Sequence, residues 1–259
     1  MFYPRLAPSA RATSVPMPFF RPALRAPGGT VQRDVGWAKT GRPYGPPMTS
    51  EVDQAHRETI VNAPAGYTSW NGTFGWQSRF HLSFDLNTNV VTVIVRLYST
   101  ATSAVRTAWE SAIESRWSRR FSLRESDDRG VVRHTYPIGV DVQWASEAAG
   151  AHYTIAGQAA GTRSGGRYGL SGTSSMTDWG TADAVDITHE FGHMLGNAEE
   201  YFTTNGTDYT AGGTRQGYRD AGGGIMNNPS ENPEQRHFEA IRAAFVALRG
   251  LPTERVTLV

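Results

Sequence analysis

Alternating apolar and polar residues predict several strands in the first two-thirds of the chain. Residues 75–99 are expected to form a hairpin, and its second strand, 90–97, is apolar on both faces, which is typical of a central strand. The stretch 138–144 alternates strictly, so one of its faces is expected to be buried. Further strands are expected at 131–136 and 152–156.

A helical period is clearest in residues 102–121. This segment is expected to form an amphipathic helix whose apolar stripe consists of Val105, Trp109, Ala112, Ile113 and Trp117. A second helix is expected to begin near Thr181 or Asp183. The order of strands and helices therefore predicts an α+β fold.

A third helix is expected near the end of the chain. Asn232 is a suitable cap, Pro233 suits the first helical position, and Gln235 follows. The segment Gly250-Leu251-Pro252 is expected to end this helix. Its apolar stripe is formed by Phe238, Ile241, Phe245 and Leu248.

Composition narrows the chemistry that the chain can carry. The chain has 259 residues, enough for one large or two small domains, and contains no cysteine. Any metal ligand must therefore be His, Asp or Glu. The formal net charge of +1 gives no reason to expect a nucleic-acid partner.

Residues 1–50 differ in composition from the remainder. They contain seven basic residues, one acid (Asp34) and nine of the fourteen prolines, whereas residues 51–259 contain 18 basic and 23 acidic residues. We expect a disordered Pro/Arg-rich leader at 1–50 and a single domain at 51–259. The leader is read as a dispensable tail, a segment that covers the cleft, or an address for export or injection machinery.

No targeting segment is recognisable in the sequence. The first residues lack the uninterrupted apolar region of a secretory signal, and no apolar run is long enough to span a membrane. We therefore expect either a cytoplasmic protein or one exported by a non-classical route. A monomer is expected.

The most informative chemistry lies at residues 189–193, which read His-Glu-Phe-Gly-His. On a helix, His189 and His193 are four residues apart and share one face, so both imidazoles can reach one ion. Glu190 lies about 100° round the helix, close enough to touch a metal-bound water but angled away from direct ligation. This arrangement is typical of a zinc hydrolase with an open position for water.

Residues after the motif supply candidates for a third ligand. Gly196 permits the positive φ that ends a helix and turns the chain, and Glu199 follows it in position to return toward the ion. Glu200 and His237 remain alternatives for the third ligand. His56, in a charged stretch, is expected to be solvated.

A glycine-rich segment at 222–228 carries Met226. Together with the extended motif, it makes the stretch from about 90 to 250 resemble the metzincin zinc peptidases, whose pattern is HExxHxxGxxH or HExxHxxGxxD followed by a Met-turn. The chain departs from that pattern in two places. Glu199 stands where His or Asp is usual, and Asn228 stands where some members have a tyrosine that stabilises the oxyanion. Candidates for that role are Asn227, Asn228, Tyr201 and His237.

The resemblance implies a metzincin-like zincin fold and a substrate class. The fold would have a twisted mixed sheet packed on an active-site helix and a backing helix, with a smaller C-terminal part ending in a helix. An edge strand that pairs with an extended peptide is expected at residues 167–170.

We therefore expect a zinc-dependent endopeptidase with Zn²⁺ as cofactor and a protein or peptide as substrate. His189, His193 and Glu199 would bind the metal, Gly196 and Met226 would support the site, and Glu190 would act as general base on the zinc-activated water. Two other interpretations remain: an effector or toxin peptidase delivered through its basic leader, and a non-catalytic module with a structural zinc site.

Overall fold

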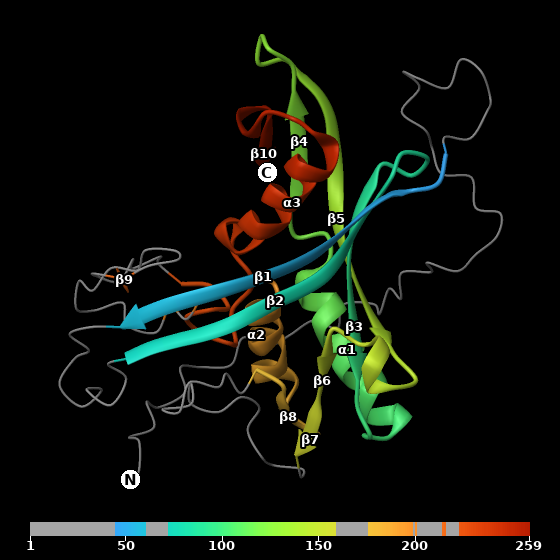
Figure 1. Ribbon diagram of the computed structural model, residues 1–259, viewed down its shortest axis with the longest axis vertical. Coiled ribbons are helices and arrows are strands. Elements are labelled where there is room, and N and C mark those ends of the chain that lie inside the picture. Colours follow the sequence, from blue (N-terminus) through green and yellow to red (C-terminus); the bar gives the residue numbers. More distant parts are fainter. Residues whose placement is uncertain (1–44, 61–71, 159–175, 199, 201–213, 216–222) are drawn as a thin grey trace, which may run out of the picture. The chain divides into compact units, whose positions relative to one another are not determined.

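The computed structural model describes residues 45–60, 72–158, 176–198, 200, 214–215 and 223–259 (Figure 1). The described residues belong to one compact unit, Arg42–Val259. The first strand begins at Met48, inside the stretch 1–50 that was expected to be leader.

The largest element is a mixed sheet with the strand order β10-β4-β5-β3-β2-β1-β9, in which β6 also pairs with β3. Strands β3 and β5 are parallel, whereas β1 and β2, β2 and β3, and β4 and β5 are antiparallel. A separate small sheet joins β7 and β8. The strands are β1 (Met48–Ile60), β2 (Gly72–Asp85), β3 (Val90–Tyr98), β4 (Ser122–Ser126), β5 (Val132–Trp144), β6 (Tyr153–Thr154), β7 (Ala156–Gln158), β8 (Asp178–Gly180), β9 (Thr214–Arg215) and β10 (Val256–Leu258).

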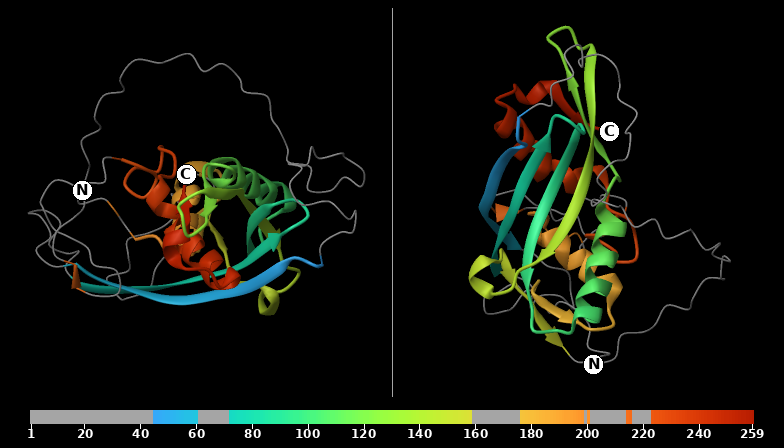
Figure 2. Two further views of the ribbon diagram at one scale, coloured as in Figure 1. Left: turned by 90° about the horizontal axis from the view of Figure 1, so that it is seen from above. Right: turned by 90° about the vertical axis from the view of Figure 1, so that its right-hand side faces the viewer.

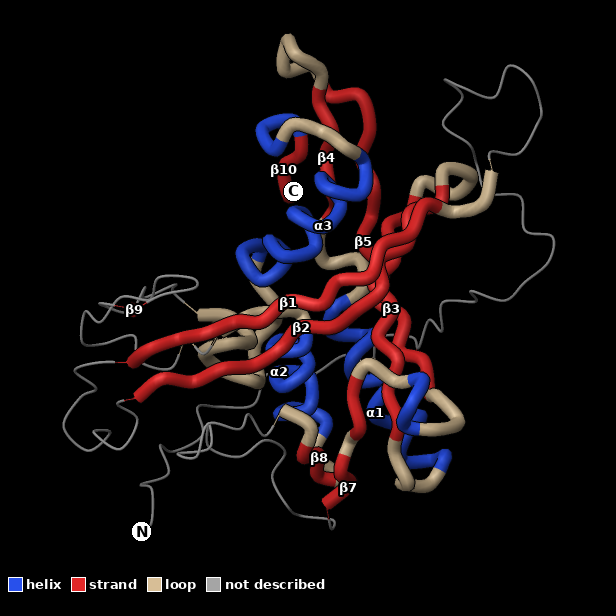
Figure 3. Tube along the Cα trace, viewed as in Figure 1, coloured by secondary structure: helices blue, strands red, loops and turns tan. Residues whose placement is uncertain are grey.

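The helices α1 (Ser103–Trp117), α2 (Ala184–Met194) and α3 (Glu239–Arg249) all cover the same face of this sheet (Figure 2). Short 3-10 helices are η2 (Ala148–Gly150), η3 (Gln235–Phe238) and η4 (Thr253–Arg255). The mixture of helices and strands along the chain is seen in Figure 3 and confirms the α+β class. Among the described residues, no helix has the length and apolar character needed to cross a membrane.

The hairpin of β2 and β3 is confirmed, and β3 lies between β2 and β5 inside the sheet. The position of β3 inside the sheet confirms that it is a central strand. Its buried residues alternate with half-buried ones, because α1, α2 and α3 cover one face of the sheet (Figure 2).

Strands β1, β4, β8 and β10 were not expected from the sequence. In β1 the only buried apolar side chain among those described is Val52, so a hydrophobic period could not reveal the strand. Instead, β1 is held by its antiparallel pairing with β2 along its whole length. The backbone pairing, rather than an apolar face, therefore defines this strand.

Strand β5 is continuous where two separate strands were expected. Its first half pairs with β4, up to the pair of Pro137 with Ser122, and its second half, from Ile138, pairs with β3. Proline has no backbone N–H to donate. Pro137 therefore lies where the strand changes partners and does not end it.

Helix α1 buries Trp109, Ile113 and Trp117, as the apolar stripe predicted. It ends at Trp117 rather than at residue 121. The hydroxyl of Ser118 accepts a hydrogen bond from the backbone N–H of Val140 at 2.9 Å and donates to the Val140 carbonyl at 3.1 Å. Arg119 then adopts a left-handed φ of 58°, so the chain leaves the helix and enters β4.

Helix α2 begins one residue after Asp183, whose side chain caps it by accepting from the Asp186 N–H at 3.1 Å. Two indoles of α1 hold the segment that contains this helix. Trp117 donates to the Thr188 carbonyl at 2.9 Å, and Trp109 donates to the Gly180 carbonyl at 3.2 Å. Helix α1 therefore backs α2 with directional hydrogen bonds as well as apolar contact.

The third helix starts later than expected. Asn232 does not cap it: its carbonyl accepts from the Ile225 N–H at 3.0 Å, and its side-chain oxygen accepts from Arg116 at 3.4 Å. Residues 235–238 form the 3-10 helix η3, capped by Glu234, and α3 follows. Its C-terminal end is confirmed, because Gly250 has a φ of 62°, a conformation that glycine adopts without strain.

One buried carboxyl generates a testable pH dependence. Burial, the largest cause, and the charges of Glu110 and Asp141 together raise the pKa of Glu114 from 4.5 to about 7, although a hydrogen bond from the Val142 N–H lowers it. The folded state thus binds this proton more tightly than the unfolded state. Its stability is expected to fall as the pH rises from 4.5 through about 7.

We expect Glu114→Gln to remove this loss. After allowance for solvent screening of a half-buried group, the variant should be about 1–2 kcal/mol more stable than wild type at pH 8, and similar to it near pH 4.5. Urea unfolding at the two pH values measures the difference. The exposed Glu147→Gln variant is the control, and equal pH dependence in all three proteins would contradict the prediction.

Candidate metal centre

Helix α2 brings His189 and His193 together. Their ring centroids lie 4.9 Å apart with the ring planes at 87°, as expected for imidazoles one turn apart on the same helix face. The residues are 1% and 3% exposed, and Glu190 between them is 8% exposed. The three motif residues are therefore buried at the end of a helix in which residues 187–194 are all buried.

The orientation of both imidazoles is set by backbone carbonyls. His189 donates from Nδ1 to the Ile225 carbonyl at 2.7 Å, and His193 donates from Nδ1 to the Asn197 carbonyl at 2.8 Å. A carbonyl oxygen can only accept, so in the neutral ring Nδ1 carries the proton and Nε2 carries the lone pair. Hydrogen bonds of this kind are typical of histidines that bind a metal through the other nitrogen.

Met226 packs directly on helix α2 at Gly192. A Cβ placed on Gly192 would overlap the sulfur of Met226 and would lie 3.2 Å from the Trp117 ring. Met226 and Ile225 are completely buried, and the turn that carries them is closed by bonds from the Asn227 and Asn228 N–H groups to the Gly224 carbonyl, both at 2.9 Å. This methionine turn, residues 223–228, thus lies against α2 at Gly192, the one glycine of the helix.

Gly196 has the positive φ that the sequence predicted, 97°. A second constraint was not foreseen: a Cβ at this position would lie 3.0 Å from the ring of His56. His56 stacks on Trp76 at 5.2 Å, and its Nε2 is 2.8 Å from the Ser78 hydroxyl. The expectation of a solvated His56 is therefore wrong, and burial lowers its pKa.

The antiparallel pairing of β1 with β2 places His56 opposite Trp76 and brings both to the motif. The indole of Trp76 meets the His193 ring edge-on at 6.3 Å. No sequence signal linked either residue to the motif, because they precede it by more than a hundred positions and β1 has no apolar period. Only the strand register reveals this side of the site.

Tyr153 connects the C-terminal end of α2 to strand β2 through hydrogen bonds. Its hydroxyl accepts from the Arg79 N–H at 2.5 Å and lies 2.9 Å from the Gln77 carbonyl and 3.2 Å from the Met194 carbonyl. Burial, the largest effect, raises the pKa of this phenol, so it stays protonated at neutral pH. A single buried hydroxyl therefore joins β2 to Met194, the last residue of α2.

The three candidates for a third ligand have different surroundings. Glu199, like Tyr201 and the segment 167–170, lies outside the described residues. Glu200 forms a two-pronged ion pair with Arg236, at 2.9 and 2.7 Å. Burial opposes ionisation of Glu200, but hydrogen bonds and charges from Arg236 and His237 outweigh it and lower the pKa of this carboxyl.

His237 is 2% exposed, and both of its ring nitrogens face protein partners. Nδ1 accepts from the Glu234 N–H at 2.9 Å, so Nε2 carries the proton, and Nε2 lies 3.4 Å from Glu200. The side chain of Asn228 also has local partners: its amide donates to Glu231 at 3.2 Å, and its oxygen accepts from Ser230. Three of the alternative ligands and oxyanion donors, namely Glu200, His237 and Asn228, therefore already form hydrogen bonds with neighbouring protein groups.

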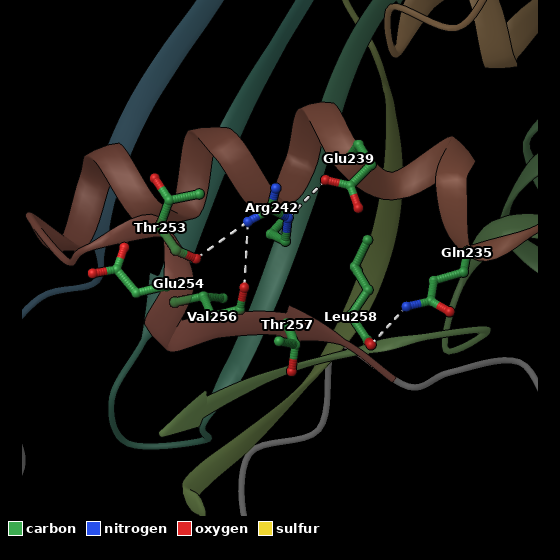
Figure 4. A pocket seen from close by; sticks show the side chains of 8 residues that line it. All are labelled: Gln235, Glu239, Arg242, Thr253, Glu254, Val256, Thr257 and Leu258. Carbon is green, nitrogen blue, oxygen red and sulfur yellow. Dashed lines mark hydrogen bonds and ion pairs between the residues drawn. The ribbon is translucent and has the colours of Figure 1, made fainter. Parts of the chain in front are cut away.

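Within the described ranges, no three His, Asp or Glu side chains form a group that could hold a metal ion. A pocket of about 470 Å³ lies elsewhere, between α3 and β10 (Figure 4). Arg242 crosses it and donates to Glu239 at 2.7 Å and to two backbone carbonyls. This pocket contains none of the predicted site residues.

Gly192→Ala tests the packing of the methionine turn. Alanine favours a helix over glycine by about 1 kcal/mol, yet the new methyl group would overlap Met226, so we expect a net destabilisation of about 1–3 kcal/mol. Thermal unfolding measures it. Gly150→Ala is the control, since nothing lies within 4 Å of its Cβ position; a stabilised Gly192→Ala protein would refute the close contact.

Searches against protein-family models, curated proteins and solved structures find no match to this chain. The resemblance to metzincins therefore rests on the residues of the motif and the methionine turn.

Proposed function

We propose that the protein is a metzincin-like zinc endopeptidase. The observation that carries this proposal is the matched orientation of His189 and His193, each donating from Nδ1 to a backbone carbonyl. A solvated surface helix with Glu and His side chains would need no such arrangement. The pair of locked tautomers is what a metal site requires of its histidines.

The donor set fits zinc. Two imidazole nitrogens and one carboxylate are a common protein ligand set for a catalytic zinc ion, which retains an open fourth position. His189 and His193 would supply the nitrogens. Glu199 would supply the carboxylate, because its spacing after Gly196 suits a returning chain and because Glu200 and His237 are bonded to each other and to Arg236 or Glu234.

When bound, zinc would supply Lewis-acid polarisation of the scissile carbonyl and activation of water at neutral pH. Glu190 would take a proton on its carboxylate and deliver it to the leaving amine, the role of a general base and then a general acid. Its burial beside the two histidines supports that role, since water around the carboxylate is limited.

Two other interpretations receive less support. A structural zinc site with His237 as a fourth ligand would require His237 to give up its bonds to Glu234 and Glu200. Delivery as an effector through the leader depends on residues 1–44, which lie outside the described part.

Glu190→Gln separates catalysis from metal binding. Glutamine keeps the size of the side chain but cannot accept the proton, so we expect zinc content near one ion per chain and peptidase activity lowered by at least about 100-fold. Mass spectrometry of the metal and cleavage of a denatured protein substrate measure the two effects. Glu239→Gln, an exposed site on α3, is the control; full activity in Glu190→Gln would sink the proposed mechanism.

Glu199→Ala tests the third ligand. Loss of one of three protein ligands should weaken zinc binding by at least about 100-fold, since each ligand adds several kcal/mol. Competition with a chelator measures the dissociation constant for both proteins. Zinc binding that is undiminished in the variant would remove Glu199 from the ligand set, and absence of zinc from the wild type would refute the proposed function.

A further inference from the structure

We propose that the ion pair of Glu200 and Arg236 is a brace that orients both motif histidines for metal binding. The inference rests on the proposed function, and it assigns a role to two residues that neither bind the ion nor touch substrate. They are positioning residues, and they act through the hydrogen bonds described below.

The first branch of the brace leads to His189. The backbone N–H of Glu200 donates to the Met226 carbonyl at 3.1 Å, and the preceding carbonyl, that of Ile225, accepts from His189 Nδ1. Arg236 also donates to the Gly223 carbonyl at the start of the same turn. The two residues of the ion pair thus contact the methionine turn at Met226, through the Glu200 backbone, and at Gly223, through the Arg236 side chain.

The second branch leads to His193. The Asn197 carbonyl accepts from His193 Nδ1, and the Asn197 amide donates to the Gly192 and His237 carbonyls at 3.0 and 3.1 Å. The His237 ring in turn faces Glu200 at 3.4 Å. A path of hydrogen bonds and short covalent segments therefore joins the two motif histidines, and Glu200 lies at its centre.

The geometry of the pair explains why it is suited to this task. Arg236 approaches Glu200 with Nε and Nη2 together, and such a fork fixes the direction of the carboxylate as well as its distance. The Glu200 side chain is 18% exposed and the Arg236 side chain is 28% exposed. A partly buried ion pair adds little net stability because of its desolvation cost, but it can specify one arrangement of the groups around it.

The test uses three variants of the full chain, with the metal-free protein and with zinc. Glu200→Gln removes the charge, and Arg236→Lys keeps the charge but loses the fork. Glu125→Gln is the matched control, because Glu125 and Arg249 form an ion pair of similar exposure, 14% and 20%, in a different part of the fold. Circular dichroism checks that each variant is folded.

Two readouts are needed. The ¹⁵N shifts of the histidine rings in the metal-free protein report the tautomers of His189 and His193, and chelator competition reports zinc affinity. We expect Glu200→Gln to mix the tautomers and to weaken zinc binding by roughly 10–100-fold, with a smaller effect for Arg236→Lys. Glu125→Gln should leave both readouts unchanged.

The outcomes separate the brace from the proposed function. Tautomers and zinc affinity that change no more in Glu200→Gln than in Glu125→Gln would overturn the brace, while zinc binding by the wild type would leave the peptidase proposal standing. If the wild type binds no zinc, the proposed function fails; a tautomer change confined to the Glu200 and Arg236 variants would then still establish the brace. Should Glu200→Gln fail to fold, Arg236→Lys alone decides.

Discussion

Burial of three ionisable residues in α2 is the constraint on which the rest of the structure depends. His189, Glu190 and His193 lie in a stretch of helix with no exposed residue, and a buried polar group without a partner is costly. The segments around the helix supply partners for both histidines. The methionine turn supplies one carbonyl and the residue after Gly196 supplies another. The arrangement of the segments around the helix therefore depends on hydrogen bonds to the motif histidines as much as on apolar packing.

Large side chains also lie close to the backbone of α2. Gly192 allows Met226 and Trp117 to reach the backbone of α2, and Trp117 also donates to the Thr188 carbonyl one turn earlier. Apolar packing and hydrogen bonding thus act on adjacent residues of one helix. Tyr153 completes the enclosure at the C-terminal end by joining the Met194 carbonyl to β2. A site held in this way has little freedom to change its geometry when a ligand arrives, which favours pre-organised binding.

Strands β1 and β2 contribute two aromatic side chains to the candidate site that the sequence motif did not indicate. His56 and Trp76 form a stacked pair across the two strands, and this pair lies against both Gly196 and His193. The chain therefore surrounds its motif with an aromatic wall from the N-terminal strands and an ion-pair network from the C-terminal segment. Glu200, which from spacing alone was a possible ligand, belongs to that network and faces Arg236 and His237.

The sequence by itself determined the elements that have a strong period or a special residue. The apolar stripe located α1, the alternation located the hairpin of β2 and β3, and the spacing of His189 and His193 predicted that they share one helix face. Tertiary structure decided what local pattern cannot encode. Polar β1 is a strand only because β2 pairs with it, α1 ends early because Ser118 bonds to β5, and Asn232 serves the methionine turn instead of a helix. In each case, a hydrogen bond to a residue outside the element outweighed the local preference, because an unpaired buried polar group costs more free energy than a weak propensity contributes.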